Sequence, residues 1–421
     1  MLRQIEGSRA IAETVALCRP EVVCAYPISP QTHIIEAIGA MVKAGSLAPC
    51  EFINVESEFA AMSVAIGASA TGARAYTATA SQGLLYMIEA VYNAAGLGLP
   101  IVMTLANRAI GAPINIWNDH SDAMAVRDAG WIQLFAETNQ EAADLHVQAF
   151  RLAEELSVPV MVCMDGFILT HAVERVDLLD QETVDRLLPP FEPRQVLDPA
   201  DPVSIGAMVG PEAFEEVRYL AHLRQLDALA RIPQIAQEFA DVTGRKSGGL
   251  VNSYRTDDAD TVVVALGSVL GTLKDAVDIR RERGERVGVV GITCFRPFPG
   301  DAVREALRGA DQIVVLEKAF SVGFGGVLST DVAMAVHGDS HVLRNVVAGL
   351  GGRPITRQSL EDMIGTAVAG DLPALTFLDL DHGAVERERI RMAGTRRSGP
   401  SAENLLRDRG TPGVVTARIQ S

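Results

Sequence analysis

A single glutamate stands near the start of the stretch NVESEFAAMSVAIGASATG, residues 54–72, in which most other side chains are small or apolar. On a helix, Glu58 shares a face with Ala61, Met62 and Ala65, and small residues there let a large group approach closely. One interpretation is a carboxylate favoured by the dipole at a helix N-terminus. The other is a buried carboxylate that bonds a ring nitrogen of a cofactor. The stretch by itself leaves both interpretations open.

Ser29 and Arg108 are candidates because each follows an expected strand. In YPISP, Ser29 is predicted to cap a helix with Pro30 at the first helical position, and a capped helix N-terminus also suits a carboxylate ligand. Arg108 comes directly after the apolar run 100–107, at the strand end where α/β proteins place their sites. An arginine there either grips a substrate carboxylate by two hydrogen bonds or forms a surface ion pair.

Three further polar side chains, Asp119, His120 and Asp122, lie in the loop RAIGAPINIWNDHSD. They suggest a metal or acid/base group, but such clusters more often satisfy the backbone of a long loop, and we favour that interpretation. The turn VGFGG at 322–326 lacks the full GxGxxG spacing of a nucleotide site, and LGSVLG at 266–271 suits packing better than phosphate binding. We therefore assign no metal or nucleotide site to this chain.

The elements that must hold these residues alternate between strand and helix. Apolar runs bounded by turn residues predict the strands 22–28, 52–56, 73–80, 100–107 and 158–165. Helices are expected between them, including one that opens at Glu58 with Ser57 as its cap. Apolar strands that alternate with helices predict an α/β fold, with a parallel sheet covered on both faces, over residues 1–175.

The rest of the chain predicts three more parts. Residues 176–258 begin rich in Pro and Asp and continue into a charged helical pattern, which indicates a linker and a helical arm. Alternation returns in 259–355, with expected strands at 261–268, 287–293 and 312–318, and predicts a second, smaller α/β domain. Residues 356–421 are expected to form an extension that contacts a partner.

Composition narrows the class of protein. The chain has 421 residues, is 48% hydrophobic and carries a formal charge of −16, so a nucleic-acid partner is not expected. Its five cysteines form no CxxC pair, so we expect no iron–sulfur or zinc site within the chain and a reducing, cytoplasmic location. No segment is apolar for long enough to span a membrane or to act as a signal peptide.

Four motifs occur in order and carry a family resemblance: YPISPQTHIIEAI, NVESEFAAMSVAIGAS, TATASQGLLYMIEA and NRAIGAPINIWNDHSDAM. Together they resemble the alpha subunit of the 2-oxoacid:ferredoxin oxidoreductases, the pyruvate synthase family. VVVALGSVLGTLKDAVD and VGVVGITCFRPFP are similar to that family's second domain. The resemblance covers residues 5 to 355. It implies a pyrimidine-type thiamine diphosphate domain followed by a domain like the C-terminal domain of transketolase.

The resemblance also implies roles for individual residues. Glu58 resembles the glutamate that bonds the aminopyrimidine ring of thiamine diphosphate and thereby assists removal of a proton from the cofactor. Ser29 and Arg108 resemble the residues that hold the carboxylate and oxo groups of the substrate, and Ile110 and Gly111 adjoin them in the substrate pocket. Many relatives have threonine where this chain has Ser29, and the hydroxyl is retained.

The chain lacks the GDG motif with which thiamine enzymes hold the diphosphate and Mg²⁺. The resemblance therefore implies partners. A beta subunit would supply the diphosphate and metal site, a ferredoxin-like delta subunit the [4Fe-4S] clusters, and a gamma subunit is associated with CoA. The implied reaction converts a 2-oxo acid and CoA into an acyl-CoA, CO₂ and two electrons.

The substrate stays open between two 2-oxo acids. The NDHSD loop favours pyruvate, but pyruvate-type relatives often have serine where this chain has Gly111. A glycine there would make room for phenylglyoxylate, whose dehydrogenases belong to this family and pass electrons to NAD through a flavoprotein subunit. Two alternatives remain: half of another thiamine enzyme, of transketolase or dehydrogenase beta type, or a non-catalytic assembly subunit.

Overall fold

The structure, a computed structural model, describes residues 2–394 and 399–410. The chain divides into two compact units, Met1–Thr376 and Phe377–Ser421. The first unit contains two large sheets and all the candidate site residues. The end of the expected C-terminal extension, residues 411–421, lies outside the described residues.

The first large sheet has seven strands, and all its pairings are parallel except that of β12 with β6. In spatial order the strands are β12 (Cys294–Arg296), β6 (Ile132–Phe135), β7 (Val160–Asp165), β5 (Val102–Asn107), β4 (Ala75–Thr79), β2 (Val22–Ala25) and β3 (Glu51–Asn54). Every residue of β4, β5 and β7 is buried, as expected for strands that are covered on both faces. The α/β prediction and its five strands in this half are confirmed.

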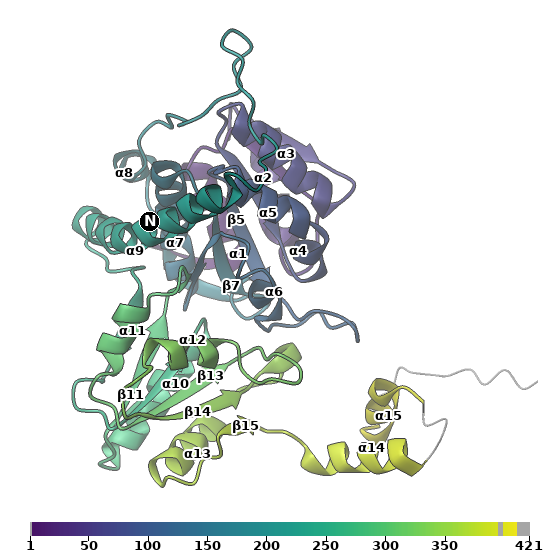
Figure 1. Ribbon diagram of the computed structural model, residues 1–421, viewed down its shortest axis with the longest axis vertical. Coiled ribbons are helices and arrows are strands. Elements are labelled where there is room, and N and C mark those ends of the chain that lie inside the picture. Colours follow the sequence, from purple (N-terminus) through teal and green to yellow (C-terminus); the bar gives the residue numbers. More distant parts are fainter. Residues whose placement is uncertain (1, 395–398, 411–421) are drawn as a thin grey trace, which may run out of the picture. The chain divides into compact units, whose positions relative to one another are not determined.

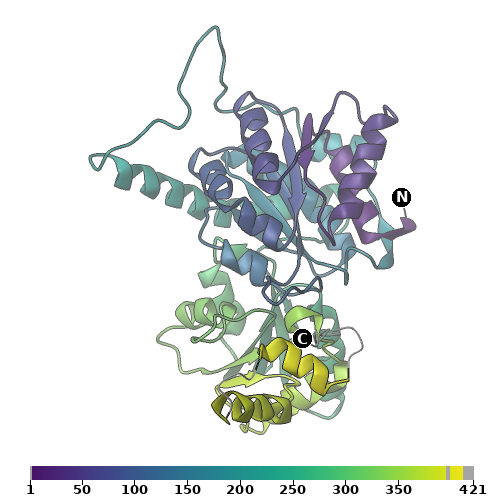
Figure 2. The same cartoon turned by 90° about the vertical axis from the view of Figure 1, so that its right-hand side faces the viewer.

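Helices cover both faces of this sheet (Figures 1 and 2). One face packs against α1 (Gly7–Leu17), α2 (Thr32–Lys43) and α7 (Asn139–Leu156). The other face packs against α3 (Glu58–Ala70), α4 (Gln82–Tyr86) and α5 (Ile88–Gly96). A short helix, α6 (Ser121–Ala125), follows the long loop after β5.

The two predicted helix caps have different outcomes. Ser57 caps α3 as predicted, since its side chain accepts a hydrogen bond from the Ala60 N–H at 3.2 Å. The prediction that Ser29 caps the next helix is wrong, because α2 begins only at Thr32 after a turn that the Gln31 N–H closes onto the Ile28 carbonyl at 2.8 Å. Ser29 therefore lies in the turn before the helix, close to the end of β2.

The second large sheet has six strands. In spatial order they are β15 (Leu375–Phe377), β14 (Val342–Val347), β13 (Gln312–Glu317), β10 (Thr261–Ala265), β11 (Val287–Ile292) and β9 (Val251–Tyr254). The three strands predicted in this half are β10, β11 and β13, and they pair in parallel. The helices of this part are α10 (Val269–Glu282), α11 (Gly300–Leu307), α12 (Leu328–Ala335) and α13 (Arg357–Val368). Because α13 packs against α10, the chain beyond residue 355 still covers this sheet.

A long helix and a small sheet connect these parts. The antiparallel pair β1 (Leu2–Glu6) and β8 (Val173–Asp177) precedes α8 (Gln181–Leu187) and the 30-residue α9 (Phe214–Thr243). The first half of α9 is largely exposed, as an arm would be. Its second half buries Ala228, Ile232, Ile235 and Phe239 in the core of the first sheet.

The second unit contains α14 (His382–Gly394) and α15 (Ser401–Asp408), which pack against each other. Arg391 of α14 bonds both Asp408 of α15, at 2.9 Å, and Glu388. Among the described residues, no helix is long and apolar enough to cross a membrane.

Candidate active site

The candidate residues gather at the carboxyl edge of the first sheet. Ser29 follows β2, Gln82 and Gly83 follow β4, and Arg108 follows β5, while Glu58 opens the helix after β3. Because the carboxyl ends of parallel strands meet at one edge, segments far apart in the sequence come together here. The hydrogen bonds and close approaches below link all five predicted site residues to this edge.

Glu58 is buried, with 7% of its surface exposed. Gly83 lies against it, so close that a Cβ on this glycine would sit 2.7 Å from Oε1 of Glu58. In the described part of the chain, no hydrogen bond or ion pair involves the Glu58 carboxylate. Neither carboxylate oxygen is among the fully buried atoms that lack a hydrogen-bond partner, so a donor from outside the described residues can reach this group.

Arg108 is buried to a similar degree, with 6% exposed. Its Nη1 donates to the Ser29 carbonyl at 2.9 Å and its Nε donates to the Asn115 carbonyl at 3.0 Å. Within residues 2–394 and 399–410 its guanidinium meets no carboxylate at ion-pair distance. Desolvation lowers the pKa of Arg108, and the charge of Asp122 opposes this shift. The arrangement leaves a buried positive charge for an anion from outside.

Asp122 holds the two sides of the site together. Its Oδ2 accepts hydrogen bonds from the N–H groups of Ser81 and Arg108, both at 2.9 Å. Its Oδ1 accepts from Asn107 Nδ2 at 2.9 Å and from the Ala123 N–H at 2.8 Å. Burial raises the pKa of Asp122 to about 7, although these donors favour the ionised form. The sequence analysis expected this residue to satisfy loop backbone, and it does so at the ends of two core strands.

The turn SQG after β4 fills the space between Glu58 and the loop. Ser81 has a positive φ of 50°, and its side chain bonds both the Ala109 carbonyl and Gln82. A Cβ on Gly111 would lie 2.6 Å from Nε2 of Gln82, so this glutamine occupies the space beside the glycine. Sequence reasoning missed Gln82. The signal that would have found it is a polar residue in a tight turn at a strand end.

The remaining candidates have supporting positions. The Ile110 N–H donates to the Ser121 hydroxyl at 3.2 Å, which anchors the loop beside Gly111. Ser29 meets Arg108 through its main-chain carbonyl. The hydroxyl of Ser29, on which the expected role rests, takes part in no hydrogen bond among the described residues.

The other polar residues of the loop bind protein groups. Asp119 accepts hydrogen bonds from the N–H groups of Ser121, at 3.0 Å, and Gly351, at 3.1 Å. His120 bonds Asp165 at 2.6 Å, and Asp165 also bonds Lys318 of the second sheet at 2.8 Å. The charges of Lys318 and His120 hold the pKa of Asp165 well below its usual range, against the effect of burial. This loop therefore joins the two sheets.

The turn VGFGG at 322–326 is not a nucleotide site. The N–H groups that follow it, on Val327, Leu328 and Ser329, donate to the Glu317 carboxylate at 2.6, 2.8 and 3.2 Å. A side chain of the protein thus takes the place that a phosphate would need.

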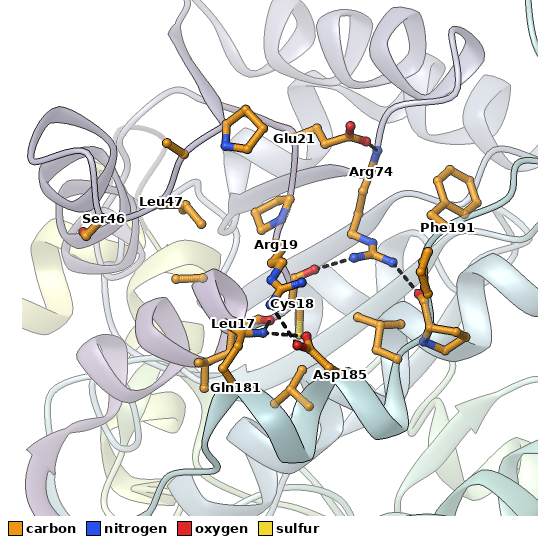
Figure 3. A pocket seen from close by; sticks show the side chains of 18 residues that line it. Leu17, Cys18, Arg19, Glu21, Ser46, Leu47, Arg74, Gln181, Asp185 and Phe191 are labelled. Carbon is orange, nitrogen blue, oxygen red and sulfur yellow. Dashed lines mark hydrogen bonds and ion pairs between the residues drawn. The ribbon is translucent and has the colours of Figure 1, made fainter.

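A cavity of about 610 Å³ lies at the opposite, amino-terminal edge of the first sheet (Figure 3). Most of the charged groups that line it have partners: Arg19 binds Asp185 at 2.8 Å, Arg74 binds Glu154 outside the lining, and Glu21 accepts a hydrogen bond from the Arg74 N–H at 2.9 Å. None of the predicted site residues lines this cavity. Of the two places, only the carboxyl edge therefore holds buried charged side chains without an ion pair among the described residues.

Two family descriptions match the chain. Residues 13–237 match "Pyruvate flavodoxin/ferredoxin oxidoreductase, thiamine diP-bdg", and residues 259–360 match "Pyruvate:ferredoxin oxidoreductase core domain II". The chain belongs to this family. Its N-terminal domain is accordingly a thiamine diphosphate-binding domain, and the half-enzymes of transketolase or dehydrogenase type are excluded.

Individual relatives support the same family assignment. This chain is 50% identical over 366 residues to the pyruvate synthase subunit PorA of Methanosarcina barkeri, and the alignment covers 86% of this chain and 91% of that protein. It is 40% identical over 387 residues to the ketoisovalerate oxidoreductase subunit VorA of Pyrococcus abyssi, which covers 91% of this chain and 95% of that one. The chain is thus an alpha subunit of the 2-oxoacid:ferredoxin oxidoreductase family, as the motifs predicted.

Solved structures share the fold of this subunit. The 2-oxoglutarate:ferredoxin oxidoreductase from Magnetococcus marinus, solved with 2-oxoglutarate, coenzyme A and succinyl-CoA bound, aligns with a TM-score of 0.66 at 18% identity. The alignment covers 87% of this chain and 65% of that one. A split-gene transketolase aligns with a TM-score of 0.50 at 14% identity. At these identities the likeness concerns the fold alone.

Proposed function

We propose that this subunit serves the CoA-dependent oxidative decarboxylation of pyruvate to acetyl-CoA and CO₂, with two electrons passed to ferredoxin. The observation that carries the proposal is that two buried charged residues at one sheet edge, Glu58 and Arg108, form no ion pair among the described residues. The 50% identity to a pyruvate synthase subunit supports pyruvate as the substrate. None of the relatives named above carries phenylglyoxylate or NAD in its name, so neither expectation gains support.

The residues at this edge fit the pyrimidine end of thiamine diphosphate. Glu58 offers a desolvated acceptor for a ring N–H, and Gly83 leaves the space beside that carboxylate free of a side chain. When bound, the cofactor supplies the centre that stabilises negative charge during decarboxylation. Glu58 holds its proton-accepting oxygen in a largely buried place, where a hydrogen bond to a ring nitrogen is strengthened once the cofactor displaces water.

Arg108 is proposed to bind the carboxylate of the 2-oxo acid. Its Nη1 and Nε are fixed by the carbonyls of Ser29 and Asn115, which orients the remaining guanidinium donors. The Ser29 hydroxyl, Ile110 and Gly111 are proposed to border the substrate beside it. Gln82 fills the space next to Gly111 and limits the room for a large substituent.

The rest of the enzyme is proposed to come from partners. A beta subunit would hold the diphosphate and Mg²⁺, a delta subunit the [4Fe-4S] clusters and a gamma subunit would assist CoA binding. The part-exposed arm of α9 and residues 356–421 are proposed contact regions. A cytoplasmic location also stays a prediction.

The test is anaerobic reduction of a viologen dye by the co-purified complex with CoA and thiamine diphosphate. Pyruvate, 2-oxoisovalerate and phenylglyoxylate are compared side by side. The expected result is the highest kcat/KM with pyruvate. Preference for 2-oxoisovalerate would place the substrate with the VorA-type relative, and preference for phenylglyoxylate would contradict the proposal.

A further inference from the structure

Three potential metal ligands meet on one side of the first sheet, although they are far apart in the sequence. Glu6 ends β1, His33 lies in the first turn of α2, and His171 lies in the segment between β7 and β8. One carboxylate oxygen and one ring nitrogen from each histidine all lie within 4.8 Å of one another. Glu6 Oε1 is 2.6 Å from His33 Nδ1, and the two imidazole ring centroids are 4.6 Å apart.

We propose that Glu6, His33 and His171 bind one divalent transition-metal ion of the zinc type. Two imidazoles and a carboxylate form the three-ligand set of zinc sites that keep a fourth position open. Bonds of about 2.0–2.2 Å to a tetrahedral ion place neighbouring ligand atoms roughly 3.4 Å apart. The Glu6 and His33 atoms, now 2.6 Å apart, must therefore separate by about 0.8 Å, and a pair at the 4.8 Å limit must approach by about 1.4 Å. Rotation of the exposed His33 and half-buried Glu6 side chains allows both changes.

A neighbouring residue orients one of these ligands. The hydroxyl of Thr170, a buried residue, lies 2.7 Å from Nδ1 of His171 and accepts a hydrogen bond from the Phe167 N–H at 2.8 Å. A hydrogen bond at Nδ1 leaves Nε2 of His171 as the nitrogen for the ion. Metal-bound histidines commonly have such a partner on their second nitrogen.

A row of rings connects this cluster with the loop that holds Arg108. The ring of His171 lies 4.6 Å from that of Phe167, which lies 4.8 Å from that of Trp117. The Trp117 N–H donates to Asn115 Oδ1 at 2.7 Å, and the Asn115 carbonyl accepts from Arg108. The fluorescence of Trp117 should therefore respond to an ion bound at the cluster.

The first experiment measures zinc binding to the full-length chain by equilibrium dialysis and elemental analysis after treatment with a chelator. The wild type is expected to bind one zinc ion. His33→Ala and His171→Ala are each expected to weaken binding at least ~10-fold, because each removes one of three ligands. His222→Ala, which removes an exposed histidine from α9, is the matched control and should bind as the wild type does.

The second experiment uses the two tryptophans of the chain, Trp117 and the fully buried Trp131. Cu²⁺ at the cluster should quench Trp117, and Trp117→Phe should abolish that saturable quenching. His33→Ala should abolish it as well. Because His33 is exposed, this variant tests the proposal even where His171→Ala lowers the folded fraction.

Two outcomes would overturn the proposal. One is a folded wild-type chain, by circular dichroism, that takes up no stoichiometric zinc. The other is zinc binding and quenching that persist unchanged in both His33→Ala and His171→Ala.

Discussion

Two buried arginines at opposite ends of the same sheet have very different surroundings. Arg74 precedes β4 and is 8% exposed; its guanidinium is paired with Glu154 and also donates to the Cys18 carbonyl at 2.7 Å. Arg108 follows β5 and is 6% exposed, but it meets only main-chain carbonyls among the described residues. Equal burial with unequal pairing indicates that the first arginine stabilises the fold, whereas the second keeps guanidinium donors for the substrate carboxylate that we propose it binds.

The carboxylates repeat this difference. Glu154 is satisfied by Arg74, and Asp165 by His120 and Lys318. Glu58, which is buried as well, has no such partner in the part of the chain that the structure describes. Among the described residues, the paired charges therefore stabilise the structure, and the unpaired buried charges are those that we propose for the site. The predictions below test that distinction.

Glu58→Gln is expected to have the largest effect on activity. In the assembled complex, pyruvate-dependent dye reduction should fall by ~10²–10⁴-fold, because the amide cannot accept a proton or a charge-assisted hydrogen bond as the carboxylate does. The melting temperature should stay the same or rise, since the variant removes an unpaired buried charge. Glu154→Gln is the matched control: it should melt at a lower temperature and keep its kcat. An unchanged rate in Glu58→Gln at full assembly would favour an assembly role for this subunit.

Arg108→Lys is expected to have the next largest effect. A lysine cannot reproduce two-point binding of a carboxylate, so the KM for pyruvate should rise ~10²-fold, with a smaller change in kcat. Steady-state kinetics measures this split. Arg74→Lys is the counterpart at the other edge; it keeps the charge but loses the two-point contact with Glu154 and donors to the Cys18 and Pro189 carbonyls, so it should lower stability by about 1–3 kcal/mol with KM unchanged. If both variants altered KM alike, the distinction between the two arginines would be wrong.

Asp122→Asn is expected to lower kcat/KM by ~10–100-fold, because the new NH₂ group must face two of the four N–H groups from which the carboxylate accepts hydrogen bonds.

The free energy of unfolding should also change with pH. The pKa of Asp122 is raised to about 7, so its contribution to folding is complete below its unfolded value of about 3.9 and is lost as pH rises towards 7. Urea unfolding at pH 5 and 7.5 should show this decline in the wild type and a smaller one in Asp122→Asn. Equal declines in both proteins would contradict the assignment.

Local sequence patterns predicted much of the fold. The apolar runs that form β4, β5 and β7 are buried on both faces. Uninterrupted apolar runs of this length predict buried parallel strands without knowledge of the tertiary structure. The Ser57 cap was also predictable from sequence, because the capping hydrogen bond joins two residues only three positions apart, Ser57 and Ala60. The short strand β12 was missed because residues 294–296 pair with β6, more than a hundred residues earlier in the chain.

The candidate site was predictable only in part. Glu58 and Arg108 were found through motifs, but the reason that they differ from other buried charges is the absence of a partner, which only the fold reveals. Gln82 was missed, and the contact between Ser29 and Arg108 was not foreseen, because both depend on how the β4 turn and the β2 turn approach the loop after β5. Such approaches join segments that no local pattern relates.

Gly111→Ser is expected to have the smallest effect, and it separates the two substrate expectations. The added Cβ would meet Nε2 of Gln82 at 2.6 Å, at the end of a flexible side chain that can rotate away. The KM for pyruvate should therefore change by less than ~10-fold, as for a packing change of about 1 kcal/mol. If Gly111 instead made room for a phenyl group, the variant would lose activity with phenylglyoxylate and keep it with pyruvate.

Gln82→Ala is expected to admit larger 2-oxo acids. The measurement is the ratio of kcat/KM for 2-oxoisovalerate to kcat/KM for pyruvate, which should rise. An unchanged ratio would show that Gln82 does not limit the pocket.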